Sequence, residues 1–392
     1  MPAQERDREL DPSDSDAERL QATSAPPEGA VEGEEEPSFF EDPGQITKTL
    51  VIVIVLIAAI YIVLPKIAGL EDAIARLGDA RRSWIAVALL ATIASFGAYV
   101  ALFRGVVGDK VVKLEWGESY QITMAGLAAT RLFSAGGAGG ILLTYWALRK
   151  AGMPRAESAK RMVAFLVLLY AVYVVAVIVF GVLLRVGLIP GEGPIEVTII
   201  PAAIAGVVAL IVLLIALIPG DLAKRLDRHT SEGRLARWMT RLAALPATVA
   251  TGVRTAWDFV CDPSRGWLAM LGAVGFWAAN IAILWASFRS LGVAVPLGEL
   301  VVGFFVGMAA NLLPAPAGVG AVDGGLIGAF AIFGFELETV IAAVLIYRLF
   351  AFYLPVPPGI VAFFQLRATV ARWEQERRGA AAGTAPPGGS TS

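Results

Sequence analysis

Six long apolar runs constrain the fold of this chain more than any other feature of its sequence. A helix of about 20 apolar residues crosses the hydrocarbon core of a bilayer, which is about 30 Å thick. Because hydrocarbon offers no hydrogen-bond partners, the backbone of such a run must satisfy its own polar groups, and a helix does so. The runs cover residues 49–64, 84–102, 162–184, 197–218, 267–291 and 340–364. We therefore predict an all-α integral membrane protein, a polytopic helical bundle.

Composition supports this class and limits the chemistry that the chain can perform. Hydrophobic residues make up 57% of the chain and charged residues 17%, against roughly 45–50% and 25% in soluble domains. One cysteine, Cys261, and one histidine, His229, exclude an internal disulfide, and we expect no zinc site. The sequence contains no nucleotide-binding loop. We therefore expect no metal, no cofactor, no catalytic residue and no nucleic-acid partner, and we predict that the protein is not an enzyme.

Charge divides the chain into three parts. Residues 1–48 hold fourteen acidic and four basic residues, a net charge of −10, while the rest of the chain carries +8. This composition predicts a disordered acidic cytoplasmic tail over 1–48. A transmembrane domain is expected over 49–370, with a cytoplasmic amphipathic loop at 219–265. Residues 371–392 are expected to form a second disordered cytoplasmic tail.

Loop charges predict the orientation of the bundle in the plasma membrane, because cytoplasmic loops carry an excess of Lys and Arg. Residues 149–161 contain five basic residues and one acidic residue, and residues 219–265 contain eight and five. Residues 187–196 and 333–339 each contain two glutamates and no basic residue. We therefore place the first two loops and both termini in the cytoplasm, and the last two loops outside.

Two apolar regions are interrupted and cannot continue as single helices. Residues 309–325 contain two prolines and four glycines, and glycines also cluster at 134–140. Proline removes a backbone donor, and glycine is about 1 kcal/mol less favourable than alanine in a helix. The arms beside these breaks reach only about 16–26 Å, less than a bilayer; they are residues 119–133, 139–149, 297–313 and 322–333. We predict two re-entrant helical hairpins, the first entering from the cytoplasm and the second from outside.

These elements recur in the same order with opposite orientation. The runs 84–102 and 162–184 flank the first hairpin, and the runs 267–291 and 340–364 flank the second. Inverted repeats with interrupted helices are a transporter architecture whose site lies near the bilayer midplane. Glycine and alanine also serve close packing of membrane helices, and the sequence leaves that alternative open.

Several motifs resemble a known family. Arg131 precedes the first glycine cluster, and Trp-Ala-Leu-Arg-Lys-Ala-Gly follows it at 146–152; the glycine- and proline-rich segment 314–324 and Tyr-Arg-Leu at 347–349 come later. Together they resemble the flippase-like transmembrane region of lysylphosphatidylglycerol synthases and the stand-alone membrane proteins related to it, over roughly residues 49–370. The soluble aminoacyl-transferase domain of that family does not follow the last run, so we expect no synthesis of lysyl-phosphatidylglycerol.

The resemblance and the interrupted helices together predict a lipid flippase or transporter for an anionic phospholipid or a polyprenyl-phosphate lipid. The returning arms would present free N–H groups and positive dipole ends to the site, which suits an anion. The candidate substrate-binding residues are Arg131, Gly136, Gly137, Gly139, Asn311, Gly318, Gly320, Asp323, Tyr347 and Arg348. Membrane lipids are the expected partners; a membrane-protein partner and the oligomeric state stay open.

Two other function classes stay open as well. One is a membrane enzyme or accessory subunit of lipid or glycan modification, and the other is a transporter of a small soluble solute. An enzyme of that kind usually needs clustered acidic residues or histidines at the membrane edge, whereas the sequence offers scattered acids such as Glu115 and Glu118.

Three charged residues in apolar surroundings carry specific hypotheses. Arg131 either binds the anionic head group or reaches the cytoplasmic surface with its long side chain. Asp323 follows the second break, and Arg348 lies eight residues into the last apolar run. We predict that these two form an intramembrane ion pair, because an unpaired guanidinium at that depth is costly. The alternative is a local cap by Asp323, with Arg348 facing water in the cavity.

Overall fold

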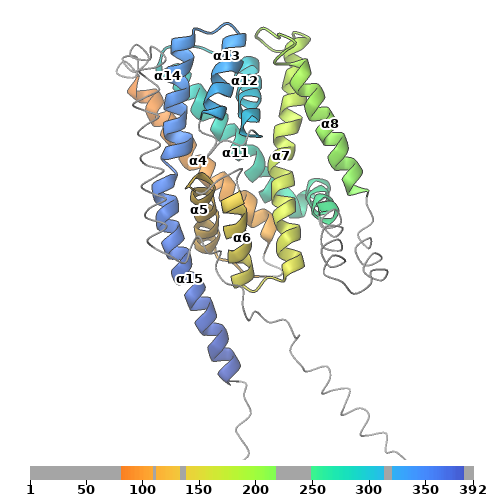
Figure 1. Ribbon diagram of the computed structural model, residues 1–392, viewed down its shortest axis with the longest axis vertical. Helices are drawn as coiled ribbons and strands as arrows, with labels where there is room; N and C mark the ends of the chain where they lie inside the picture. The colour runs from red at the N-terminus through yellow and green to blue at the C-terminus, as the bar shows by residue number, and fades with distance from the viewer. Residues whose placement is uncertain (1–80, 109–111, 133–137, 218–248, 313–319, 384–392) are drawn as a thin grey trace, which may run out of the picture. The chain divides into compact units, whose positions relative to one another are not determined.

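The computed structural model of this chain describes residues 81–108, 112–132, 138–217, 249–312 and 320–383. All of these residues belong to one compact unit, Thr47–Ser392. Within the described ranges the regular structure is helical and includes no strand (Figure 1). The predicted acidic tail at 1–48, the first apolar run at 49–64 and most of the amphipathic loop at 219–265 lie outside them.

In the described part of the chain, five helical segments are long and apolar enough to cross a membrane. They are α4 (Arg82–Val107), α7 (Arg155–Arg185), α8 (Ile199–Ala216), α11 (Pro263–Ser290), and a continuous segment made of α14 (Leu337–Arg348), the π-helical turn Leu349–Tyr353 and α15 (Val356–Gly383). Each contains all or most of one predicted apolar run. For these residues the prediction of an all-α polytopic membrane protein is confirmed.

Local sequence sets where two of these helices begin. Pro263 occupies the first position of α11, and Oδ1 of Asp262 accepts a hydrogen bond from the backbone N–H of Ser264 at 3.1 Å. Both features stabilise a helix N-terminus. In the first turn of α7, Glu157 is favoured by the helix dipole and accepts a hydrogen bond from Nε of Arg161 at 2.6 Å.

Four shorter helices form two pairs. The first pair is α5 (Trp116–Leu132) with α6 (Ala138–Lys150), and the second is α12 (Leu297–Ala309) with α13 (Ala321–Ile332). The longest has 17 residues and reaches about 26 Å, so none of the four crosses a bilayer alone. In Figure 1 the first pair lies in the lower half of the bundle and the second in the upper half. The helical arms of the predicted hairpins are therefore present, while their re-entry from opposite sides stays a prediction.

The two sets of helices make corresponding contacts. Helices α4 and α11 lie along each other in the most extensive pairing of the described residues, while α7 packs against α12 and α15 packs against α5. Nδ2 of Asn280 on α11 donates to Oγ of Ser95 on α4 at 3.0 Å. The hydroxyl of Tyr173 on α7 donates to the carbonyl oxygen of Phe305 on α12 at 2.5 Å. This order of contacts accords with an inverted repeat, which stays a prediction.

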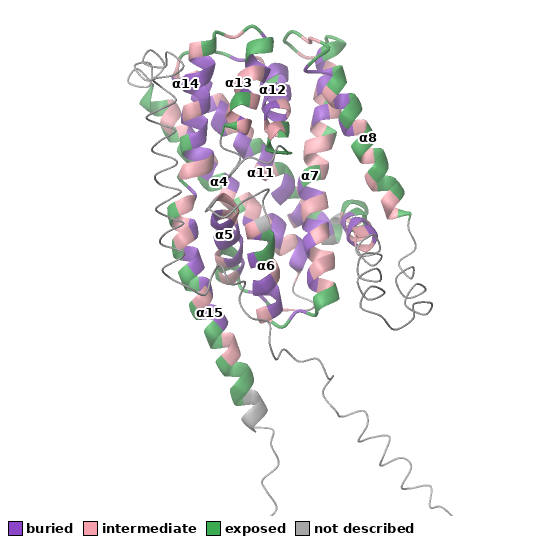
Figure 2. Ribbon diagram, viewed as in Figure 1, coloured by how far each residue is buried: buried purple, intermediate pink, exposed green. Residues whose placement is uncertain are grey.

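Burial separates the inner helices from the outermost one (Figure 2). The core contains large aromatic side chains with less than 2% exposure, among them Phe103, Phe288, Phe304 and Phe330. Helix α8 packs against α7 and leaves most of its apolar side chains exposed. In a bilayer such a surface faces the acyl chains, where apolar side chains are favoured.

Glycines allow the two arms of each pair to approach closely. A Cβ atom added at Gly325 would overlap the carbonyl oxygen of Gly307 on the facing arm. One added at Gly140 would overlap the carbonyl oxygen of Gly126. Small residues are a common means of close packing between membrane helices. At Gly126, Gly140, Gly307 and Gly325, glycine therefore serves close packing, which is the alternative role that the sequence left open.

We expect Gly325→Ala to lower the free energy of unfolding by about 1–3 kcal/mol, because the new methyl group forces two backbones apart. Gly324→Ala is the matched control in the same helix: a Cβ there meets nothing within 4 Å. Alanine should make that control more stable by up to about 1 kcal/mol. Thermal unfolding in detergent compares the two variants, and equal stability would show that the close approach is not required.

The C-terminal part of the chain differs from the prediction. The sequence predicts disorder over 371–392, yet α15 continues to Gly383. Its last turns contact the first helix pair: Nε1 of Trp373 donates to Oε1 of Glu118 at 3.1 Å, and Nζ of Lys150 lies 2.7 Å from Oε1 of Glu374. The partners are 255 and 224 positions apart, so the composition of residues 371–392 alone cannot predict these contacts.

Candidate functional site

The last membrane segment is interrupted where it passes both helix pairs. The π-helical turn Leu349–Tyr353 follows α14, and Pro355, Pro357 and Pro358 come directly after it. Proline has no N–H to donate, so each of these residues leaves the carbonyl oxygen four positions earlier without its usual helix partner. For Pro355 that oxygen belongs to Ala351.

Arg131 supplies a donor for this oxygen from the first helix pair. It lies in the last turn of α5, and its Nη2 donates to the carbonyl oxygen of Ala351 at 2.7 Å. Its Nη1 donates to the carbonyl oxygen of Phe352 at 3.1 Å. Arg131 thus compensates for the donor that Pro355 lacks and connects the first pair to the last membrane segment.

Arg348 is held by the second helix pair. Its Nε donates to Oδ1 of Asp323 in the first turn of α13, and the Arg348 side chain is only 7% exposed. The other carboxylate oxygen, Oδ2, accepts a hydrogen bond from the backbone N–H of Gly320 at 2.9 Å. The predicted ion pair is present in the structure. Asp323 also forms the local cap of the alternative hypothesis, because each carboxylate oxygen has its own partner, but Arg348 is buried and does not face water.

The ring of Phe352 brings the two arginines together. The guanidinium carbons of Arg348 and Arg131 lie 4.9 and 5.3 Å from its centroid. Cations at this distance are attracted by the face of an aromatic ring. Asp323 compensates one of the two positive charges, so these four residues carry a net charge of +1. We refer to Arg131, Asp323, Arg348 and Phe352 as the arginine cluster.

Two tyrosines lie close to the arginine cluster. Tyr347 is 4% exposed, and its ring meets that of Phe304 on α12 edge-on, with centroids 5.9 Å apart. Both Tyr347 and Tyr99 of α4 are near enough to Arg131 to interact with it electrostatically. The surroundings of the cluster are therefore largely aromatic, and hydroxyl groups accompany the charges.

Comparison with known proteins places the chain in a family. The profile described as the lysylphosphatidylglycerol synthase TM region matches residues 49–359. The chain belongs to this family. A curated relative, the "UPF0104 membrane protein" of Methanothermobacter thermautotrophicus, is 32% identical over 91 residues, which are 23% of this chain and about a quarter (26%) of that protein. No solved structure matches the chain significantly.

In this member of the lysylphosphatidylglycerol synthase TM-region family, four predicted site residues meet. Arg131, Asp323 and Arg348 belong to the arginine cluster, and Tyr347 lies beside it. They come from the first helix pair, the second pair and the last membrane segment. The sequence could nominate them only as charged or polar residues near the breaks, and the fold brings them together.

The other predicted site residues lie along the breaks. Gly139 is in the first turn of α6, Asn311 is exposed in the short 3₁₀ turn Ala310–Leu312 after α12, and Gly320 precedes α13 with a φ of 81°. A left-handed φ of this kind favours glycine. Three predicted residues lie outside the described part of the chain: Gly136, Gly137 and Gly318.

Sequence reasoning missed Phe352, Tyr99 and Pro355. A signal for the last was available, because Pro355, Pro357 and Pro358 lie inside the apolar run 340–364. Prolines within a membrane helix free backbone carbonyl oxygens that another group must satisfy. No sequence signal could have identified Arg131 as that group.

The helix N-termini beside the two breaks differ in character. In α13 the carboxylate of Asp323 caps the N-terminus. In α6, by contrast, the first turn contains no acidic residue. A helix N-terminus attracts anions, and Arg131 lies just before the same break. Positive character is therefore concentrated at the first helix pair.

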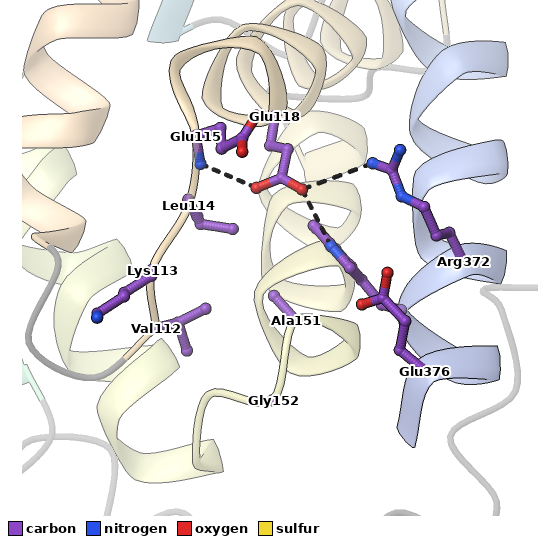
Figure 3. Close-up of a pocket in the computed structure, with 10 residues that line it drawn as sticks. Val112, Lys113, Leu114, Glu115, Glu118, Ala151, Gly152, Arg372 and Glu376 are labelled. Carbon is purple, nitrogen blue, oxygen red and sulfur yellow. Dashed lines mark hydrogen bonds and ion pairs between the residues drawn. The ribbon is translucent and has the colours of Figure 1, made fainter. Parts of the chain in front are cut away.

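A separate polar cavity of about 610 Å³ lies at the opposite end of the first pair, between the segment before α5, the α6–α7 turn and α15 (Figure 3). Glu118 borders it, and its Oε2 accepts from the backbone N–H of Glu115 at 2.9 Å. Its Oε1 accepts from Nε1 of Trp373 at 3.1 Å and lies 3.8 Å from Nη2 of Arg372. Glu118, one of the scattered acids considered for an enzyme, thus connects α5 to α15.

Proposed function

We propose that this protein is a flippase or transporter for an anionic lipid, a phospholipid or a polyprenyl-phosphate lipid, and that it is not an enzyme. The observation that supports this is the arginine cluster, where two guanidinium groups share one ring and one carboxylate compensates only one of them. Charges inside membrane proteins are costly and mark substrate pathways by default. A phosphate head group would compensate the remaining positive charge.

The position of the cluster supports transport. In Figure 1 the ends of both helix pairs that border the breaks lie midway along the long helices. Transporters with interrupted helices hold their substrates near the bilayer midplane. The family description names lysylphosphatidylglycerol, which is a phospholipid, and this favours a lipid over a soluble solute.

We further place the protein in the plasma membrane with both termini in the cytoplasm, following the loop charges. Leu188, in the loop after α7, is 73% exposed, and Trp116, at the start of α5, is 55% exposed. In a Cys261→Ala background, Leu188→Cys should react with an impermeant thiol reagent on intact cells. Trp116→Cys should react only after permeabilisation, and the reverse pattern would invert the orientation.

The function is tested with purified protein in proteoliposomes that contain a trace of fluorescent phosphatidylglycerol. Dithionite added outside bleaches only the outer leaflet, so continued bleaching measures lipid movement. We expect movement of phosphatidylglycerol well above that of phosphatidylcholine in parallel vesicles. Equal rates would remove the selectivity for an anionic head group. Uptake of a soluble sugar phosphate without lipid movement would show that the protein transports a solute and not a lipid.

A further inference from the structure

The contact between Arg131 and the last membrane segment joins two parts of the bundle. Above the π-helical turn Leu349–Tyr353, α14 packs against α11 and α13; below it, α15 packs against α5 and α6. The turn is therefore the point at which this segment passes from the second helix pair to the first. Arg131 bonds to that turn from the end of α5.

The partners of Arg131 in this contact are neutral carbonyl oxygens. A bond from a guanidinium to a phosphate oxygen joins two opposite charges, and this Coulomb attraction adds to the hydrogen bond; a neutral carbonyl oxygen offers no such charge. Arginine also matches phosphate with two parallel bonds. An anionic head group beside the first break would therefore compete for the same Nη1 and Nη2 atoms.

Loss of Arg131 from the turn would leave the carbonyl oxygen of Ala351 without this donor. Pro355 cannot replace it, because proline has no N–H. An unsatisfied carbonyl oxygen in a membrane costs several kcal/mol, so the turn must rearrange when the arginine leaves. Prolines and π-bulges are the places where long helices bend by more than about 20°.

This inference rests on the proposed function. We propose that the phosphate of the lipid breaks the hydrogen bonds from Arg131 to the carbonyl oxygens of Ala351 and Phe352, and we call this contact the latch. When Arg131 turns to the head group, the last membrane segment bends at Leu349–Tyr353, and α15 moves with the first helix pair relative to α14 and the second pair. Pro355 contributes to the latch, because in the usual α-helical spacing the Ala351 oxygen accepts from the N–H of residue 355, and proline has none.

The first experiment concerns stability and needs no ligand. The N–H of Leu354 bonds five positions back to the carbonyl oxygen of Leu349, while the backbone angles of Leu354, −59° and −34°, are helical. An N–H at position 355 would reach the Ala351 oxygen where the helix returns to its usual four-residue spacing. We expect Pro355→Ala to reduce the loss of thermal stability caused by Arg131→Ala by at least half. The matched control is Pro357→Ala, which offers a donor to the Tyr353 oxygen that Arg131 does not contact. Equal effects of the two proline variants, or none from Pro355→Ala, would overturn the latch.

The second experiment measures bending with two spin labels in the Cys261→Ala background. Val175→Cys on α7 and Phe364→Cys on α15 place them at positions that are 57% and 56% exposed. A 20° bend moves a residue eleven positions beyond the hinge by about 6 Å. We expect a shift of that size between phosphatidylcholine and phosphatidylglycerol vesicles. The pair Val175→Cys and Leu337→Cys, on the α14 side of the hinge, should keep its distance.

The outcomes separate the latch from the proposed function. Transport of phosphatidylglycerol without a change in the label distance overturns the latch alone. A shift that survives Arg131→Ala does the same. If inorganic phosphate added to phosphatidylcholine vesicles produces the full change in label distance, the latch is supported and responds to the anion itself. The requirement for a lipid is then contradicted. If neither anion moves the labels and no lipid is transported, both proposals fail.

Discussion

Asp323→Asn and Arg348→Gln should each destabilise the protein by about 3–5 kcal/mol, whereas the double variant should cost less than the sum. Each single substitution leaves a charge without its partner in surroundings where the Arg348 side chain is 7% exposed. Removing both groups removes part of that penalty. Thermal unfolding of the four proteins of the cycle in detergent should give a coupling energy of about 2–3 kcal/mol.

A second ion pair provides the matched control for this cycle. Lys150 and Glu374 lie 2.7 Å apart and also join two helices, but their side chains are 17% and 35% exposed. Pairs that remain in contact with water contribute little, about 0–1 kcal/mol when fully exposed, so Lys150→Gln and Glu374→Gln should be closer to additive than the first pair. Additivity in the Asp323–Arg348 cycle as well would mean that the two charges do not stabilise each other in the membrane.

Arg131→Ala should reduce transport of phosphatidylglycerol by about 10- to 100-fold, since hydrogen bonds to a charged group contribute about 1.5–3 kcal/mol and 1.4 kcal/mol is a factor of ten. Arg131→Lys keeps the charge and loses the planar fork, so an intermediate rate is expected. The dithionite assay described above measures both. Arg185→Ala, at an exposed arginine near the end of α7, is the control that should transport normally.

The same arginine also stabilises the fold, so lost transport alone does not identify its role. Pro355→Ala should restore the stability of Arg131→Ala by satisfying the Ala351 oxygen, yet it supplies no positive charge. The double variant should therefore fold well and still fail to move phosphatidylglycerol. Recovery of transport along with stability would show that Arg131 serves the helix turn and does not contact the head group.

Sequence reasoning was most successful where the physics is local. The apolar runs at 84–102 and 162–184 lie within α4 and α7, because length and hydropathy alone decide whether a segment can cross a membrane as a helix. The interruption at 309–325 was readable for the same reason, since proline and glycine act on their own backbone. The pairing of Asp323 with Arg348 could be predicted because few opposite charges were available in the apolar sequence.

The partners of Arg131 could be found only in the folded chain. They are backbone carbonyl oxygens 220 and 221 positions away, and every residue carries such an oxygen, so the sequence does not mark which two bond to Arg131. Folding selects them by placing the end of α5 beside the turn that Pro355 interrupts. The continuation of α15 to Gly383 depends on the same kind of contact, since side chains of α5 and α6 hold a segment whose own composition favours disorder.

Sequence alone determined which segments are helical and apolar, because those properties belong to each segment. Tertiary structure decided which charges and carbonyl oxygens meet, because that depends on packing between segments far apart in the chain.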